Sequence, residues 1–243
     1  MSAIVIGASS GLGRALAEEL ARCQHDLLLV ASDPRDLEAL AADLKLRYEI
    51  AVNTLALDLG READPGARIA SALDGLPAPD ALLLPIGHSR RDDDFSLDAA
   101  AAGQLLAINL HAPLAIVQAL LPRLLETRGT IVLFGSIAAV RGRGRNVVYA
   151  SAKRALVSLY ESLRQRYGSQ ELQVQLYQLG FLATNLTLGM PLPTPPIAPT
   201  RVAKTVVARL RRGSSLGYLP VKFALIALIV RALPWPIYRR MKE

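Results

Sequence analysis

Short apolar segments alternate with helix-like segments along most of this chain, and this alternation limits the folds open to it more than any other feature. Buried strands are predicted from the apolar runs at 3–6, 27–31, 52–57, 81–84, 131–134 and 172–178. Helices are predicted from the leucine and alanine spacing at 12–23, 37–46, 62–74, 98–125 and 149–167. Strands that are apolar on both faces and joined by helices form a parallel sheet with helices on each side. The sequence therefore predicts a doubly wound α/β fold.

The turn after the first predicted strand is rich in glycine. Besides Ala8 it comprises Gly7, Ser9, Ser10, Gly11, Leu12 and Gly13. Glycines let the backbone turn tightly and approach a diphosphate, and the helix that follows offers free amide groups and partial positive charge. In a doubly wound sheet, ligands bind at this edge, beyond the carboxyl ends of the strands. We therefore predict a dinucleotide-binding turn; the alternative is a glycine-rich turn with a structural role only.

Tyr149 and Lys153 are four residues apart at the start of a predicted helix, so they share one helical face. An ammonium beside a phenol favours the phenolate, and this charge pairing is expected to lower the pKa of Tyr149. A tyrosine tuned in this way passes a proton to a carbonyl oxygen or takes one from an alcohol. Ser136, just after the fifth predicted strand, is placed to hydrogen-bond the same oxygen. The alternative is an ordinary surface pair of side chains.

Length and composition narrow the choice of partners. The 243 residues suit one domain, expected over 1–243, because no interior linker divides them. Aromatic residues make up only 5%, which argues against a stacking surface for single-stranded nucleic acid. Cys23 is the sole cysteine, which excludes an intrachain disulfide and favours a reducing, cytoplasmic compartment. The histidines are too scattered to predict a metal site, and Asp92-Asp93-Asp94 is expected to be a solvated loop.

Positive charge is concentrated at the C-terminal end. The net charge is +7, but residues 201–243 carry ten basic residues and one acidic residue, so residues 1–200 have a net charge of −2. We therefore expect no nucleic-acid partner. Within 220–243 an uncharged apolar run, 223–230, precedes Trp235 and two further arginines. This run is too short for a bilayer span of about 20 residues. A membrane interface or a lipid tail is its expected partner; a subunit contact or a cap over the substrate cavity is the alternative.

These motifs together resemble the short-chain dehydrogenase/reductase family. The matching positions are Gly7, Gly11, Gly13, Asp58, Asn109, Ser136, Tyr149, Lys153, Gly180 and Thr184. The resemblance implies a Rossmann-type domain and a nicotinamide-dependent oxidoreductase that interconverts a ketone and a secondary alcohol. It implies Tyr149 as acid and base, Ser136 as the residue that orients the substrate, and Lys153 as the residue that holds the nicotinamide ribose.

The resemblance implies further contacts as well. Asn109 would position a water in the proton relay, Asp58 would contact the adenine end, and Thr184 would contact the carboxamide or the phosphates. The chain departs from the family's usual pattern at Ile6, at 84–87 and at Leu179. Only Gly87 is kept from the family's stretch after the fourth strand, so the departures affect cofactor contacts and leave the catalytic positions intact. Family members commonly form homodimers or homotetramers, and the same is expected here.

Cofactor preference is expected to depend on the residues after the second predicted strand. An acidic residue there binds the adenosine 2′-hydroxyl and repels a 2′-phosphate. In the resemblance, NAD-preferring members carry aspartate at the position of Ala31. Ser32 and Arg35 are candidates for binding a 2′-phosphate, whereas Asp33 opposes it. NADP is therefore predicted in preference to NAD.

Three arginines, Arg141, Arg143 and Arg145, lie in the segment between the predicted catalytic serine and tyrosine. Their guanidinium groups suit a phosphate-bearing substrate, and a solvated basic loop is the alternative. His88 is expected to line the substrate cavity. The proline-rich segment within 183–200 is expected to be a loop over the substrate.

The arginine loop and the tail resemble one branch of the family, the reductases of polyprenylphosphoryl 2-keto-pentoses. The leading hypothesis is a cytoplasmic reductase, associated with the inner face of the plasma membrane through 221–243, that acts on a polyprenylphosphoryl keto-sugar or another lipid-linked carbonyl. A second hypothesis is a reductase or dehydrogenase of a fatty-acyl, steroid or other small carbonyl compound. A third, prompted by the altered stretch 84–87, is a non-catalytic NAD(P)-binding regulator or scaffold.

Overall fold

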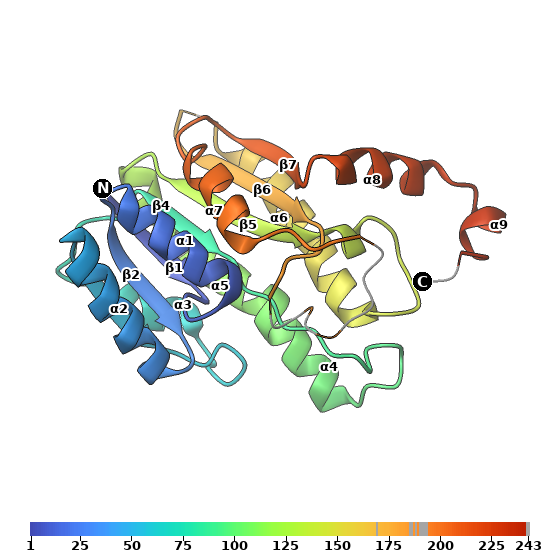
Figure 1. Ribbon diagram of the computed structural model, residues 1–243, viewed down its shortest axis with the longest axis horizontal. Helices are drawn as coiled ribbons and strands as arrows, with labels where there is room; N and C mark the ends of the chain where they lie inside the picture. Colours follow the sequence, from blue (N-terminus) through green and yellow to red (C-terminus); the bar gives the residue numbers. More distant parts are fainter. Residues whose placement is uncertain (169, 185–186, 188, 190–193, 242–243) are drawn as a thin grey trace.

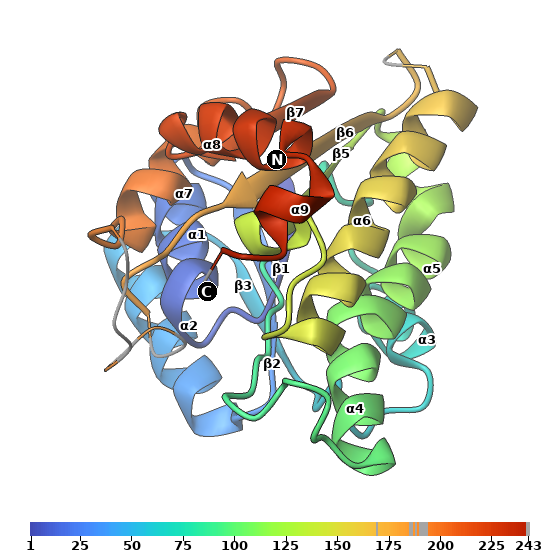
Figure 2. The ribbon, with the colours of Figure 1, turned by 90° about the vertical axis from the view of Figure 1, so that its right-hand side faces the viewer.

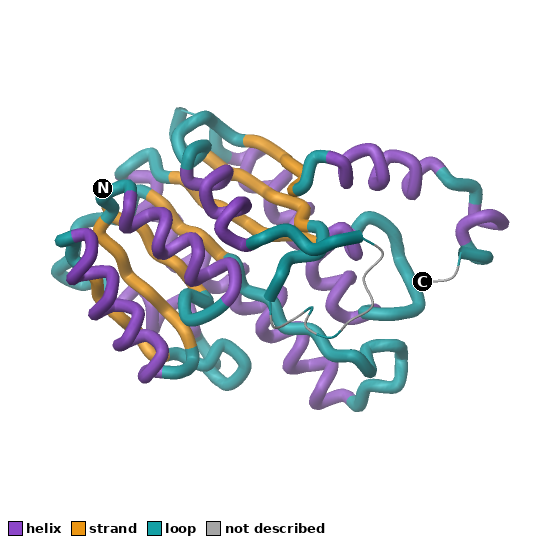
Figure 3. The backbone as a smooth tube through the Cα atoms, in the orientation of Figure 1, coloured by secondary structure: helices purple, strands orange, loops and turns teal. Residues whose placement is uncertain are grey.

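The computed structural model describes residues 1–168, 170–184, 187, 189 and 194–241, which form a sheet between two layers of helices (Figures 1 and 3). The strands are β1 (Ser2–Ile6), β2 (Asp26–Ala31), β3 (Val52–Ala56), β4 (Ala81–Leu84), β5 (Thr130–Ser136), β6 (Gln173–Leu179) and β7 (Ser215–Leu219). The first helices are α1 (Gly11–Arg22), α2 (Pro34–Tyr48), α3 (Pro65–Ala72), α4 (Ala99–Leu106), the π-helical turn η1 (Ala107–His111) and α5 (Ala112–Glu126). The later ones are the 3₁₀ turn η2 (Ile137–Ala139), α6 (Val147–Arg166), α7 (Pro199–Val207), α8 (Lys222–Ala232) and α9 (Trp235–Tyr238).

The strands of this sheet are parallel and lie in the order β3-β2-β1-β4-β5-β6-β7. The chain therefore runs outward from β1 through β2 and β3, then returns to add β4 on the other side of β1. Such a reversal leaves a crevice at the carboxyl ends of the two central strands, where ligands bind in doubly wound folds. The predicted fold class is confirmed.

Both faces of the sheet are covered by helices (Figure 2). α1, α2 and α7 pack on one face through a cluster that includes Leu16, and α3, α5 and α6 pack on the other through a cluster that includes Leu120. Alternate strand residues enter the two clusters, as Val5 and Ile4 do in β1. This double burial is why the strands are continuous apolar runs in the sequence.

The helix predicted at 98–125 consists of α4, η1 and α5 in succession. Pro113 lies in the first turn of α5, where a missing N–H is tolerated. Among the described residues, Ala99–Glu126 is the one helical stretch that is long and apolar enough to cross a membrane. Leu120 and its neighbours on one face are buried against the sheet, and 39% of the apolar window is buried in this way.

The C-terminal part of the fold holds two elements that the sequence patterns do not predict, α7 and β7. β7 carries Gly217 in its interior, which weakens a strand pattern. A Cβ at Gly217 would lie 3.3 Å from the ring of Tyr177, so the glycine accommodates this fully buried side chain. After β7, α8 and α9 form the predicted helical tail and extend beyond the edge of the sheet (Figure 1).

Candidate active site

A pocket of about 490 Å³ lies at the carboxyl ends of the central strands. The predicted residues in its wall are Gly7, Ser9, Ser10, Gly11, Leu12, Ser32, Asp58, Gly87, Ser136, Arg143, Tyr149, Lys153, Gly180 and Thr184. Apolar residues that the sequence did not single out line it too, among them Ile108, Ile137, Phe181 and Leu182. The structure thus brings most of the predicted site to one cavity, and gives that cavity an apolar lining.

The glycine turn between β1 and α1 brings backbone amides to one end of the pocket. Gly7 and Gly11 have φ angles of +86° and +51°, in the left-handed region that side chains rarely adopt. Gly13 is not in the pocket wall; a Cβ there would lie 1.8 Å from the carbonyl oxygen of Gly7, so only glycine lets α1 pack on the turn. Ser10 precedes α1 without a side-chain capping bond, which leaves the first amides of this helix available to an anion.

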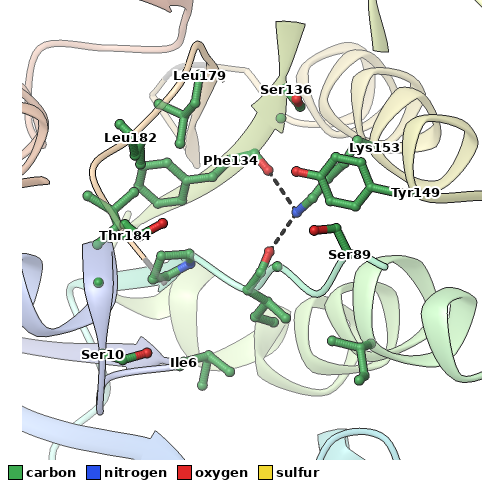
Figure 4. A pocket seen from close by; sticks show the side chains of 18 of the residues that line it. Ile6, Ser10, Ser89, Phe134, Ser136, Tyr149, Lys153, Leu179, Leu182 and Thr184 are labelled. Carbon is green, nitrogen blue, oxygen red and sulfur yellow. Dashed lines mark hydrogen bonds between the residues drawn. The ribbon is translucent and has the colours of Figure 1, made fainter. Parts of the chain in front are cut away.

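Lys153, on α6, is a buried cation at the other end of the pocket (Figure 4). Its ammonium donates hydrogen bonds to the backbone carbonyls of Ile86 at 2.6 Å and Phe134 at 3.2 Å. The residue is only 2% exposed, and burial lowers the pKa of its ammonium to about 8. The contact with residue 86 uses the backbone, so the unusual sequence at 84–87 does not disturb it.

Tyr149 lies one turn before Lys153, and its phenol points into the same part of the pocket (Figure 4). The ammonium nitrogen of Lys153 is 5.9 Å from the centre of the Tyr149 ring. Burial raises the pKa of Tyr149 above its ordinary value, and a hydrogen bond with Ser136 acts in the opposite direction. The structure therefore differs from the prediction that Lys153 lowers this pKa, because in the protein alone the ammonium is bonded to the carbonyls of Ile86 and Phe134 while the phenol is desolvated.

Asn109 lies in η1 and is fully buried. Its side-chain amide donates to the carbonyls of His88 at 2.7 Å and Leu105 at 2.9 Å, and its oxygen accepts from the His88 N–H at 3.1 Å. Neither Asn109 nor His88 is part of the pocket wall. Asn109 therefore links the loop after β4 to the helical stretch formed by α4, η1 and α5. The water-positioning role of Asn109 and the substrate contact of His88 stay predictions.

The end of β2 carries the groups expected to select the cofactor. Ser32 and Asp58 are part of the pocket wall, but Arg35 is not. The guanidinium of Arg35 donates to both carboxylate oxygens of Asp33, at 2.8 and 3.2 Å. These bonds lower the pKa of Asp33 to about 2. The structure thus differs from the prediction for Arg35: its charge is directed at Asp33, two residues away, and not at the cavity.

The three loop arginines have different surroundings. Arg143 lines the pocket, whereas Arg145 is exposed. Arg141 is directed away from the cavity and into the C-terminal tail, where it donates to the carbonyls of Val230 at 2.9 Å and Leu233 at 2.5 Å. The structure therefore agrees with the prediction for Arg143 and differs from it for Arg141, which binds carbonyls at the C-terminal end of α8. The substrate contact of Arg145 stays a prediction.

The segment after β6 lies across the glycine turn. Thr184 is close to Gly11, since a Cβ there would lie 3.1 Å from the Thr184 methyl carbon. Gly180 packs against Phe223 of α8, and a Cβ at Gly180 would lie 2.3 Å from that ring. Part of the predicted substrate loop 183–200 lies outside the described residues.

Asp93 is a site-forming residue that sequence reasoning missed. The sequence predicts a solvated Asp92-Asp93-Asp94 loop, yet Asp93 is only 1% exposed. Its two carboxylate oxygens accept hydrogen bonds from the backbone amides of Val148 and Tyr149, each at 2.9 Å. No local sequence pattern predicts this contact, because the partners are more than fifty positions apart in the chain.

Sequence comparisons identify a family profile and individual proteins that are similar to this chain. The short chain dehydrogenase family profile matches residues 1–190. An uncharacterized oxidoreductase of Mycobacterium tuberculosis is 27% identical over 239 residues, which cover 98% of this chain and 96% of that protein. Human very-long-chain 3-oxoacyl-CoA reductase is 25% identical over 245 residues, which cover 98% of this chain and 77% of that protein.

Solved structures agree with this placement. A short chain dehydrogenase/reductase family protein superposes with a TM-score of 0.78 at 26% identity, covering 90% of this chain and 94% of its own. A short-chain dehydrogenase from Sphingobium yanoikuyae in complex with NADPH has the same fold, with a TM-score of 0.84 at 24% identity over 100% of this chain and 96% of its own. The chain therefore belongs to the short-chain dehydrogenase/reductase family and is an NAD(P)-dependent oxidoreductase.

Proposed function

We propose that this protein reduces a ketone carried on a long apolar chain to a secondary alcohol, with NADPH as the preferred cofactor. The observation that carries the proposal is that Tyr149, Ser136 and Lys153 line one pocket whose opposite end is the glycine turn. Phe181 and Leu182 also line this pocket, and an apolar lining favours an apolar substrate.

The residues present fit a nicotinamide dinucleotide. The open amides at the start of α1 suit its diphosphate, and the buried ammonium of Lys153 suits the hydroxyls of its ribose. When bound, the nicotinamide supplies the hydride. Tyr149 donates the proton to the substrate oxygen, and Ser136 hydrogen-bonds that oxygen as its negative charge develops. Lys153 would hold the ribose hydroxyls with its ammonium, and its charge beside the phenol would then favour the phenolate.

Two substrate classes share the required apolar chain. A long-chain 3-oxoacyl compound is supported by the similarity to human very-long-chain 3-oxoacyl-CoA reductase. A polyprenylphosphoryl keto-sugar is supported by Arg143, which lines the pocket and suits a phosphate. The non-catalytic hypothesis is disfavoured, since Ser136, Tyr149 and Lys153 are all present and line one pocket.

The experiment that tests this proposal compares NADPH oxidation with a long-chain 3-oxoacyl-CoA, a polyprenylphosphoryl keto-sugar, and short ketones that carry the same carbonyl. The proposal predicts a kcat/KM for one of the long substrates about a hundredfold above that of its short analogue, because each buried methylene contributes about 0.8 kcal/mol. Equal kcat/KM for long and short ketones would refute the apolar-chain substrate and leave the oxidoreductase class intact.

Cofactor preference gives a separate prediction. Ser32 is in the pocket wall, and Asp33 beside it is neutralised by Arg35. Replacing Ser32 with Asp adds an uncompensated carboxylate, which is expected to lower kcat/KM with NADPH by about tenfold or more relative to NADH. The check is the ratio of the two kcat/KM values, with Ser32→Asn as the uncharged control. A ratio unchanged by Ser32→Asp would show that the 2′-phosphate does not bind at this strand end.

A single domain over 1–243, a homodimeric or homotetrameric assembly and a cytoplasmic location stay predictions. Light scattering of the purified protein tests the assembly.

A further inference from the structure

The tail exposes an apolar surface that faces away from the rest of the fold. Its six most exposed apolar side chains, here called the tail surface, are Val221, Leu225, Leu228, Ile229, Trp235 and Ile237. In α8 only Phe223 and Ala227 are buried against the fold. Leu225 and Leu228 remain 63% and 65% exposed. An apolar surface of this kind marks a contact with a partner or a membrane.

The tail is held in one orientation by the loop that precedes α6. Arg141 donates to two carbonyls at the end of α8, and its guanidinium lies 4.1 Å from the centre of the Tyr238 ring. The hydroxyl of Tyr238 donates to the carbonyl of Gly142 at 2.7 Å. The start of α8 is fixed as well, by the edge-to-face contact of Phe223 with Phe181 in the pocket wall. The tail surface is therefore a built feature next to the pocket.

Charge identifies the partner of this surface. From Leu172 to Lys242 the sequence carries no acidic residue. The tail surface is bordered by exposed Lys222, Arg231, Arg239 and Arg240. A second copy of this surface would add its own cations to the interface and no acidic residue from 172–242, so the like charges would repel. Anionic lipid headgroups neutralise the cations, while the acyl region receives the leucines and the tryptophan.

We propose that the tail surface docks on a membrane that carries anionic lipids. The proposal goes beyond the proposed function, because this surface holds no reacting group and docking requires no turnover. Docking would place the rim of the pocket at the bilayer, from which a substrate with a long apolar chain has only a short path to Phe181.

The test is cosedimentation of the full chain with vesicles of phosphatidylglycerol and phosphatidylcholine, and with vesicles of phosphatidylcholine alone. The chain is expected to bind the mixed vesicles about tenfold or more tightly than the neutral ones. The double variant Leu225→Glu/Leu228→Glu and the double variant Arg239→Glu/Arg240→Glu are each expected to lose at least about tenfold of the binding to mixed vesicles. Leu46→Glu, at an 84% exposed leucine on α2, is the control and should bind like wild type.

Two outcomes would overturn the proposal. One is equal binding of wild type to mixed and neutral vesicles, or none to either. The other is a Leu225→Glu/Leu228→Glu variant that binds vesicles as wild type does. The proposal also fails if light scattering shows that wild type is a dimer that does not bind vesicles, and that the main change in the variant is dissociation of this dimer. The control is the rate at which this variant oxidises NADPH with a soluble ketone. A wild-type rate shows that the fold and the active site are intact. This control therefore separates failure of docking from failure of the proposed function.

A second inference rests on an independent observation, the N-terminus of the catalytic helix. Asn146 precedes α6 with a φ of +52° and makes no side-chain capping bond. Asp93 accepts the capping hydrogen bonds that the side chain of Asn146 does not. Besides the two carboxylate bonds to Val148 and Tyr149, its backbone carbonyl accepts a hydrogen bond from the Val147 N–H at 3.2 Å. We infer that Asp93 is a positioning residue for Tyr149, which sets the phenol at the substrate oxygen by fixing the first turn of α6. This inference rests on the proposed catalytic role of Tyr149.

Asp93→Asn and Asp93→Ala test it, with Asp92→Asn and Asp94→Asn as neighbouring controls that are exposed in the structure. Asp93→Ala is expected to lower kcat by about a hundredfold with KM for NADPH little changed. A misplaced phenol of Tyr149 slows the proton transfer but does not weaken the binding of NADPH. Asp93→Asn keeps one acceptor oxygen and should fall in between. Removing the negative charge of Asp93 should also lower the apparent pKa of Tyr149 in the pH profile of kcat.

The controls are expected to stay within about threefold of wild type. If Asp93→Ala does not fold, Asp93→Asn decides the question. A folded Asp93 variant with wild-type kcat and an unshifted pH profile would refute the positioning role. If Tyr149→Phe itself were active, the proposed function would fail before this inference was reached.

Discussion

Replacing Tyr149 with phenylalanine is expected to lower kcat for ketone reduction by about a thousandfold or more, because the substrate oxygen loses its proton donor in the transition state. The ring remains, so the pocket keeps its shape. NADPH binding is expected to stay within about threefold of wild type, since the glycine turn and Lys153 are untouched. Stopped-flow oxidation of NADPH measures the first effect, and fluorescence titration of NADPH measures the second.

Tyr160 provides the matched control on the same helix. It is a buried tyrosine of α6 whose hydroxyl accepts a hydrogen bond from Arg164 at 2.9 Å, and it is not part of the pocket wall. Tyr160→Phe is expected to lose about 1 kcal/mol of stability and to keep turnover within about threefold of wild type. Near-native turnover of Tyr149→Phe, or equal losses in the two variants, would contradict the catalytic assignment.

Replacing Lys153 with methionine is expected to abolish most of the activity and to change how stability depends on pH. The ammonium has a pKa of about 8 in the folded protein, below its ordinary value of 10.5. The unfolded chain therefore binds more protons between these two values, so the free energy of unfolding rises with pH there. Between pH 7.5 and pH 9.5 the rise due to this lysine is about 2 kcal/mol. In the methionine variant this contribution is absent.

Urea unfolding of wild type and Lys153→Met at a series of pH values, without cofactor, measures the difference. The raised pKa of Tyr149 contributes in the opposite direction only above pH 10, because a group kept neutral by folding loses its stabilising effect as pH rises past its unfolded value. The chosen pH range therefore isolates the lysine. Parallel stability curves for the two proteins would show that the ammonium of Lys153 is not destabilised by burial.

The parts of this site that follow from local sequence are predictable. The strand and helix alternation indicates the doubly wound sheet, and that sheet brings the turn at Gly7 and the helix with Tyr149 and Lys153 to the same edge. These predictions succeed because each depends on residues a few positions apart and on a topology that few alternatives satisfy.

The predictions that differ from the structure depend on partners distant in sequence or on competition between partners. Arg35 is next to the expected phosphate position, but Asp33 binds it. Arg141 belongs to a loop near the pocket, but the end of α8 binds it. Asp93 is one of three consecutive aspartates, and only its place under α6 distinguishes it. The pKa of Tyr149 likewise depends on desolvation, which spacing along a helix does not reveal.

Under the proposed function, the phenol of Tyr149 becomes the acid and base of the reaction when the cofactor joins Lys153 in the pocket. An ultraviolet difference titration of wild type against Tyr149→Phe, with and without NADP⁺, follows this one phenol directly. The phenol is expected to ionise above pH 10 in the protein alone and at a clearly lower pH in the complex with NADP⁺. A phenol that ionises at the same pH in both would contradict it.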